Sequence, residues 1–177
     1  MPYDARRELL DVYGHNITTL RALIRDLPDH VIRVQGTGSE RWSILEIICH
    51  LRDTEQRTFG RVQQMINEDA PLFDGLDADA LARESDYQSQ SQDEALEVFE
   101  HTRREQIAYL NELSNEEWTR TAIHEQAGEI TVQSLTAHMA AHDCVHMAQI
   151  SRRIQETRSD TSARRRQVID RTVKSDP

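Results

Sequence analysis

Apolar residues return at every third or fourth position in four long stretches of this 177-residue chain, and this spacing restricts its fold more than any other feature. The first stretch runs from Tyr3 to Leu27 and is followed at once by Pro28, which cannot continue a helix. Its spaced residues are Leu10, Tyr13, Ile17, Leu20, Ile24 and Leu27. Residues so spaced cover one face of an α-helix, so the stretch predicts an amphipathic helix.

Capping residues mark where the other three helices begin. Ser43 with Glu46, and Ser91 with Glu94, have the S-x-x-E spacing of a capping box, and Thr131 is a good cap in front of the last stretch. The predicted helices cover residues 3–27, 44–68, 92–113 and 132–153. Four long helices joined by polar connections predict a helical bundle.

The connections carry the remaining polar and acidic residues. They are predicted at Asp29–Arg41, Ala70–Gln90 and Arg120–Ile130, with a short capped turn at Ser114–Trp118. The second is long and acidic, and it is broken by Pro71 and Gly75, with one helical turn expected near Asp77–Arg83. Only 6 glycines and 4 prolines occur in the chain, too few for a fold with many turns, which favours an all-α four-helix bundle.

Length and charge limit the organisation and the partners. We expect one domain over residues 1–156 and a polar, partly basic C-terminal extension over 157–177 that is frayed or depends on a partner. A net charge of −10 disfavours nucleic acid, and no apolar run approaches membrane-spanning length. Without a leader segment and with only Cys49 and Cys144, the chain is expected in the cytoplasm; a single disulfide between them stays an open alternative.

Two histidines interrupt the apolar stripe of the last helix. His142 and His146 stand where Val132, Leu135 and Ile150 predict a buried face. Burying an unpaired imidazole nitrogen costs about 1 to 3 kcal/mol, so both rings need hydrogen-bond partners or a metal ion. The i, i+4 spacing allows both to reach one ion, and paired core histidines are the alternative.

A third imidazole is available from the second helix, where His50 lies at the edge of the apolar stripe and could face the last helix. Three histidines would leave a coordination position open for water or substrate, as in a catalytic rather than a structural zinc site. Asp53, Asp143 and Gln149 could orient the imidazoles, or lie on solvated helix surface. No catalytic residue is assigned.

The other candidates are predicted away from this site. His138 is expected to flank it, while Cys49 and Cys144 point elsewhere. Trp42 and Trp118 are expected to pack at helix starts, with the mouth of a pocket as the alternative. Four further histidines are predicted on the surface: His15, His30, His101 and His124.

Two motifs resemble the DinB superfamily, in particular its YfiT-like branch of proteins named as metal-dependent hydrolases. They are WSILEIICHLRDTE at Trp42–Glu55 and HMAAHDCVHMAQI at His138–Ile150, and the resemblance runs over about Tyr3–Gln155. It implies an up-down-down-up four-helix bundle that often dimerises. It also implies that His50, His142 and His146 bind zinc or nickel, and that a low-molecular-weight thiol can be a cosubstrate.

Two classes of function remain in view. A divalent ion with an open site predicts an enzyme, either a hydrolase that uses an activated water or a transferase or isomerase that uses a thiol. A non-enzymatic bundle with a structural or vestigial site, acting as a protein interaction module, is the alternative. The small-molecule substrate cannot be read from the sequence.

Overall fold

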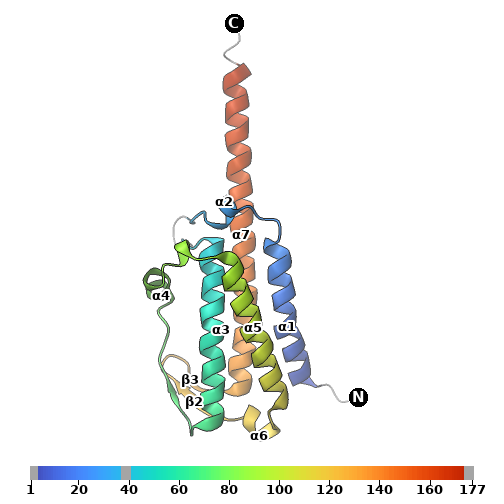
Figure 1. Ribbon diagram of the computed structural model, residues 1–177, viewed down its shortest axis with the longest axis vertical. Coiled ribbons are helices and arrows are strands. Elements are labelled where there is room, and N and C mark those ends of the chain that lie inside the picture. The colour runs from blue at the N-terminus through green and yellow to red at the C-terminus, as the bar shows by residue number, and fades with distance from the viewer. Residues whose placement is uncertain (1–3, 37–40, 174–177) are drawn as a thin grey trace.

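Four long helices, two running in each direction, form the body of the protein. The computed structural model describes residues 4–36 and 41–173, with side chains described up to residue 159. The long helices are α1 (Ala5–Ile24), α3 (Ile44–Asn67), α5 (Gln92–Glu112) and α7 (Val132–Val173). In Figure 1, α1 and α7 run upward and α3 and α5 run downward, which confirms the predicted up-down-down-up bundle.

The predicted caps begin the predicted helices. At α3, Ser43 and Glu46 form the reciprocal capping box, with the Ser43 N–H donating to Glu46 Oε2 at 2.7 Å. The Ser91 hydroxyl accepts a hydrogen bond from the Glu94 N–H at 3.4 Å, and Thr131 Oγ1 accepts one from the Ser134 N–H at 3.0 Å. Because capped N–H groups have no partner inside the helix, these side chains fix where each helix starts.

Short elements fill the connections. The helical turn expected near Asp77–Arg83 is α4 (Ala78–Glu84), capped by Asp77, and the turn after Ser114 is α6 (Asn115–Trp118). The loop predicted at Asp29–Arg41 contains a short helix, α2 (Asp29–Ile32), and part of it lies outside the described residues. A 3₁₀ turn, η1 (Tyr87–Ser89), precedes α5.

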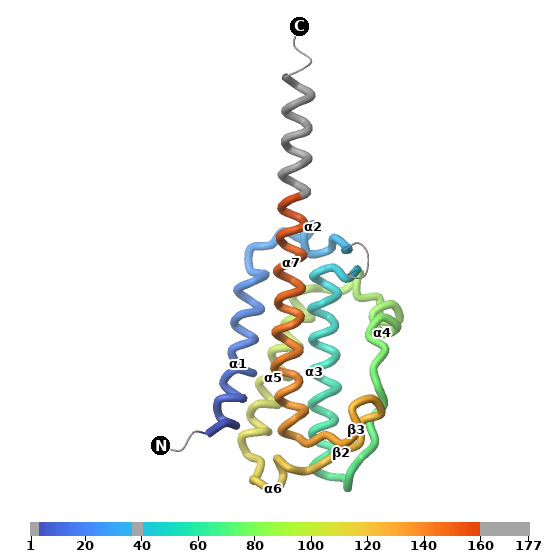
Figure 2. Tube along the Cα trace, turned by 180° about the vertical axis from the view of Figure 1, so that it is seen from behind, coloured from blue at the N-terminus to red at the C-terminus, as the bar shows by residue number. Residues whose placement is uncertain are grey.

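A small sheet, which the sequence did not predict, forms within two of the predicted connections. Its strands are β1 (Leu72–Phe73), β2 (Thr121–His124) and β3 (Gly128–Thr131), in the order β1-β2-β3. β1 pairs with β2 in parallel, and β2 pairs with β3 in antiparallel. Gly128, the first residue of β3, adopts a φ of 73° directly after the turn that joins the two strands. Both views place this sheet and α4 along the side of α3 that faces away from α1 (Figures 1 and 2).

The C-terminal extension is helical where it is described. α7 continues past residue 157 to Val173, and residues 174–177 lie outside the described part. That the extension is frayed or depends on a partner stays a prediction. Cys49 is buried and Cys144 is exposed, and both are free, which removes the disulfide alternative. Among the described helices, none is long and apolar enough to cross a membrane.

The apolar core is divided into two clusters by a polar layer. One cluster lies toward α2 and includes Ile48 and Phe99, and the other lies toward α6 and includes Met65 and Trp118. Each long helix places a buried polar residue between its contributions to the two clusters: Asn16, Glu55, Arg103 and Asp143.

Arg103 is the centre of this polar layer. Its side chain is fully buried and donates to Glu55 through Nε at 2.7 Å and Nη2 at 2.8 Å. Nη1 donates to Asp143 Oδ2 at 2.8 Å and to the Tyr13 carbonyl at 2.9 Å. The Tyr13 hydroxyl donates to Glu55, and Asn16 Nδ2 donates to Asp143. Burial raises the pKa of Glu55, while the Arg103 guanidinium acts against that rise.

Replacing Arg103 should expose how much the bundle depends on this layer. Arg103→Ala leaves two buried carboxylates without their cation and should lower the free energy of unfolding by about 3 to 5 kcal/mol, measured by urea denaturation. The matched control is Arg104→Ala, which removes an exposed arginine from buried Glu100 but leaves that carboxylate paired with Arg21, and it should cost less than about 1 kcal/mol. Equal losses in the two variants would contradict this account.

Candidate metal centre

The structure brings together the three histidines that the sequence singled out. His50 comes from α3, and His142 and His146 come from successive turns of α7. One nitrogen from each lies within 4.8 Å of the others. His142 Nε2 is 3.1 Å from His50 Nε2 and 3.1 Å from His146 Nε2, so the three ring edges converge on one point. His50 is buried, and the other two are half-buried.

These distances suit a metal ion. Two imidazole nitrogens at 2.0 to 2.1 Å from a tetrahedrally coordinated zinc ion lie about 3.3 Å apart. The 3.1 Å separations between the Nε2 atoms are close to that value. In the described part of the chain, the cluster contains no carboxylate, which separates it from the two-histidine, one-carboxylate sites of non-haem iron oxygenases.

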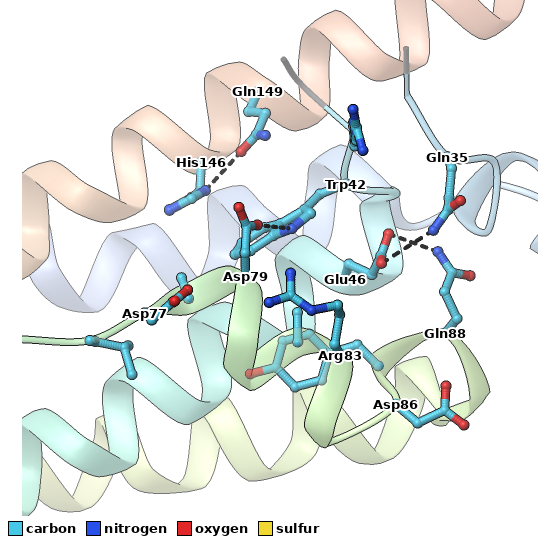
Figure 3. Close-up of a pocket in the computed structure, with 15 residues that line it drawn as sticks. Gln35, Trp42, Glu46, Asp77, Asp79, Arg83, Asp86, Gln88, His146 and Gln149 are labelled. Atoms are coloured by element: carbon cyan, nitrogen blue, oxygen red, sulfur yellow. Dashed lines mark hydrogen bonds between the residues drawn. The ribbon is translucent and has the colours of Figure 1, made fainter. Parts of the chain in front are cut away.

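The positions of the hydrogens also favour a cation. His146 Nδ1 lies 2.9 Å from Gln149 Oε1, as Figure 3 shows, so Nδ1 carries the hydrogen and Nε2 presents a lone pair. Neutral His142 Nε2 either donates or accepts, so it cannot satisfy both His50 and His146 by hydrogen bonds. A cation that accepts all three lone pairs removes this conflict, and Gln149 then holds the His146 ring in place.

The other two residues predicted to orient the imidazoles bind elsewhere. Asp53 accepts hydrogen bonds from the Tyr87 hydroxyl and from Arg52 Nε, both at 2.6 Å. Asp143 accepts from Arg103 and Asn16 in the polar layer. Charged guanidinium donors bind carboxylates more strongly than a neutral imidazole does, which accounts for these partners. The two carboxylates therefore act on the histidines only through their charge.

Burial keeps the imidazoles neutral. It lowers the pKa of His50 to about 4 and the pKa of His142 to about 3, and the charge of a protonated His146 is the second cause in both cases. Burial also lowers the pKa of His146. At neutral pH the three rings thus carry lone pairs, which is the state that binds metal.

Aromatic and further histidine rings surround the cluster. The Trp42 ring lies 4.9 Å from the His50 ring and stacks at 6.5 Å on His146, and its Nε1 donates to Asp79 at 2.9 Å (Figure 3). Trp42 therefore lines a pocket, whereas Trp118 packs in the core as predicted. The His138 ring lies 6.1 Å from the His142 ring, beside the cluster and outside the ligand set.

Two cavities reach the cluster from different sides. The larger, of about 930 Å³, extends from His146 past Trp42 to α4 and η1. The smaller, of about 470 Å³, is bordered by His50 and His142 and by the β2–β3 hairpin. Leu76 and Ala78 border both. His124, predicted on the surface, is half-buried and lines the smaller cavity, because β2 carries it toward α3.

An up-down-down-up helical bundle with three histidines converging between α3 and α7 defines the class of protein. The family model described as the DinB superfamily matches residues 13–150. The chain therefore belongs to the DinB superfamily. Its fold is similar to that of a solved structure described as "YfiT from Bacillus subtilis is a probable metal-dependent hydrolase with an unusual four-helix bundle topology", with a TM-score of 0.80.

That structural match covers 89% of this chain and 90% of the YfiT chain at 16% sequence identity, so it establishes the fold alone. In sequence, the chain is 22% identical over 109 residues to a protein of Oceanobacillus iheyensis named "Putative metal-dependent hydrolase OB0413". This match covers 62% of each protein, less than two thirds of the relative's length.

Metal binding by the cluster can be tested by replacing ligand and flanking histidines in parallel. Protein purified without nickel resin should hold about one equivalent of divalent metal, and His142→Ala should lose it. His138→Ala, the matched control, should retain it, and Gln149→Ala should weaken binding by about 10- to 100-fold. Elemental analysis and chelator competition provide the measurements. Equal metal content in the His142→Ala and wild-type proteins would rule out this site.

Acid should destabilise the metal-free protein. In the folded protein the pKa of His50 is lowered to about 4 and the pKa of His142 to about 3. Below the ordinary histidine pKa of 6.5, the unfolded chain therefore binds protons at these two residues that the folded protein does not bind. The free energy of unfolding is therefore largest above pH 6.5 and should fall as the pH drops, by up to about 1.4 kcal/mol per pH unit for each group. Urea denaturation at pH 7.5, 6 and 5 measures the slope. His142→Gln should flatten it, and an unchanged slope would refute this cause.

Proposed function

We propose that this protein is a divalent-metal-dependent hydrolase of small molecules. The convergence of three neutral imidazole nitrogens beside two cavities carries the proposal. The name of the Oceanobacillus relative and the description of the Bacillus subtilis structure support it as analogies.

The protein's own residues would divide the work as follows. His50, His142 and His146 would hold the ion, which when bound supplies Lewis acidity and lowers the pKa of a water ligand toward about 7. Gln149 keeps the hydrogen of His146 on Nδ1, away from the ion. Trp42 covers one side of the cluster with an apolar ring, which limits the access of bulk water.

Thiol transfer is the second candidate, because two cavities meet at the cluster. A reaction between a low-molecular-weight thiol and an electrophile needs room for two molecules, and the cluster borders two cavities that share Leu76 and Ala78 in their linings. In that case the metal would favour the thiolate form of the cosubstrate. A bundle without turnover, acting as a protein interaction module, is the remaining alternative.

The finer attributes remain predictions from the residues and the resemblance. Zinc and nickel are the metals we expect, since imidazole ligands suit both. A cytoplasmic location, a homodimer, and the absence of nucleic-acid and membrane partners likewise stay predictions.

Activity of metal-free, zinc-loaded and nickel-loaded protein on a panel of activated esters and amides tests the proposal. A hydrolase should turn over at least one of them only when metal is present, and glutathione, bacillithiol or mycothiol should not change its rate. His142→Ala should reduce turnover by more than about 100-fold. Loss of a residue that only orients a metal ligand typically reduces activity by about 10- to 100-fold. His101→Ala, an exposed histidine on α5, is the control.

A strict requirement for a thiol would favour transfer over hydrolysis. Full metal loading without turnover of any substrate, with or without thiol, would favour the non-enzymatic alternative.

A further inference from the structure

The two cavities beside the histidine cluster differ in charge. The larger cavity is lined by four carboxylates, Glu46, Asp77, Asp79 and Asp86, together with two arginines. The smaller cavity is lined by Arg57 and Arg61 and by no aspartate or glutamate. The chain as a whole has a net charge of −10, so the charge of this wall is opposite to that of the molecule. Such a wall favours an anionic ligand.

Helix geometry places the two arginines and one of the histidines on the same side of α3. Arg57 and Arg61 follow His50 by seven and eleven residues, and at about 100° per residue both lie within about 20° of its direction. They stand roughly 10 and 16 Å farther along the helix, at a rise of 1.5 Å per residue. An anion held by the arginines would thus have the rest of its molecule directed along α3 toward the cluster.

Neither arginine is held by an ion pair in the described part of the chain. Both donate an Nη2 hydrogen to the main-chain carbonyl of Asp74, at 3.4 Å for Arg57, and the Arg61 guanidinium lies 4.9 Å from the centre of the Phe73 ring. Within the described residues, neither guanidinium has a carboxylate partner within salt-bridge distance. Each has five N–H donors, so most of them remain for a ligand.

The two positive charges also repel each other. Burial is the main cause that lowers the pKa of Arg61, and the charge of Arg57 is the next, with Asp74 acting in the opposite direction. An anion between the guanidinium groups would relieve this repulsion.

Polar groups on the opposite wall can complete the site. The Gln126 N–H donates to His124 Nδ1 at 3.2 Å, so the His124 hydrogen is on Nε2, where it can be donated. On the α3 side, Thr58 adds a hydroxyl group to the lining, whereas the Ser134 hydroxyl, which also borders the cavity, donates to the Thr131 carbonyl. A volume of about 470 Å³ suits a small metabolite.

We propose that Arg57 and Arg61 bind a carboxylate or phosphate group of a small organic anion in this cavity, with its reactive centre facing His50 and His142. That this anion is the substrate rests on the proposed function. Binding of the anion to the two arginines does not require the metal.

Calorimetric titration of the full chain with succinate and with inorganic phosphate tests this proposal and distinguishes the two kinds of anion. Metal-loaded and metal-free wild-type protein should both bind at least one probe. Arg57→Gln and Arg61→Gln should each weaken binding by about tenfold or more, since each removes a charged hydrogen bond. Arg83→Gln, an arginine of the larger cavity, is the matched control and should leave the affinity within about twofold.

Two further measurements separate loss of the anion site from misfolding of a variant and from absence of the metal. Succinamide, the neutral analogue of succinate, should bind wild-type protein at least about tenfold more weakly, a comparison that needs no variant. Metal content is measured on the same samples. Loss of anion binding in the Arg57 and Arg61 variants without any bound metal in wild type would support the anion site while removing the proposed function.

The anion site would be overturned by an unchanged affinity in the Arg57→Gln and Arg61→Gln variants. An equal loss of affinity in Arg83→Gln, or equal binding of succinamide and the dianion, would overturn it too. Binding of neither succinate nor phosphate to wild-type protein would also overturn it.

Discussion

A single buried guanidinium connects all four long helices. Arg103 extends from α5 and binds Glu55 of α3, Asp143 of α7 and the Tyr13 carbonyl of α1. A planar group with fixed donor directions allows little sliding between its partners, so it sets how far α3 and α7 are shifted along each other. Because Asp143 follows His142 directly, and Glu55 lies little more than one turn after His50, the same contacts determine where the three imidazoles meet.

The long helices could be predicted from the sequence because their signal is repeated many times. Each stretch carries several apolar residues at helical spacing. A single polar residue among them therefore does not hide the helical periodicity. The sheet offers no such repetition. β1 has two residues and β2 has four, and their pairing joins segments about fifty residues apart, so neither alternation nor a local turn identifies them.

The histidines could be predicted because a buried imidazole is costly and therefore informative. Arg103 lies on the apolar face of α5 and obeys the same argument, but its partners depend on how α3 and α7 align, which no local pattern contains. Because of that alignment, Asp143 accepts a hydrogen bond from Arg103 and not from an imidazole. The position of His124 in a cavity wall depends on strand β2, which the sequence did not predict.

The parallel pairing of β1 with β2 makes the walls of the cavities structurally independent of the bundle interior. Main-chain hydrogen bonds from Ile123 to Pro71 and from Glu125 to Phe73 hold the connection that carries Leu76 and Ala78, whatever side chains it bears. The bundle interior fixes the imidazoles, while this sheet-held connection forms the walls around them. Side chains along the connection can therefore be exchanged, and the shape and charge of the cavities with them, without moving the backbone that carries the histidines.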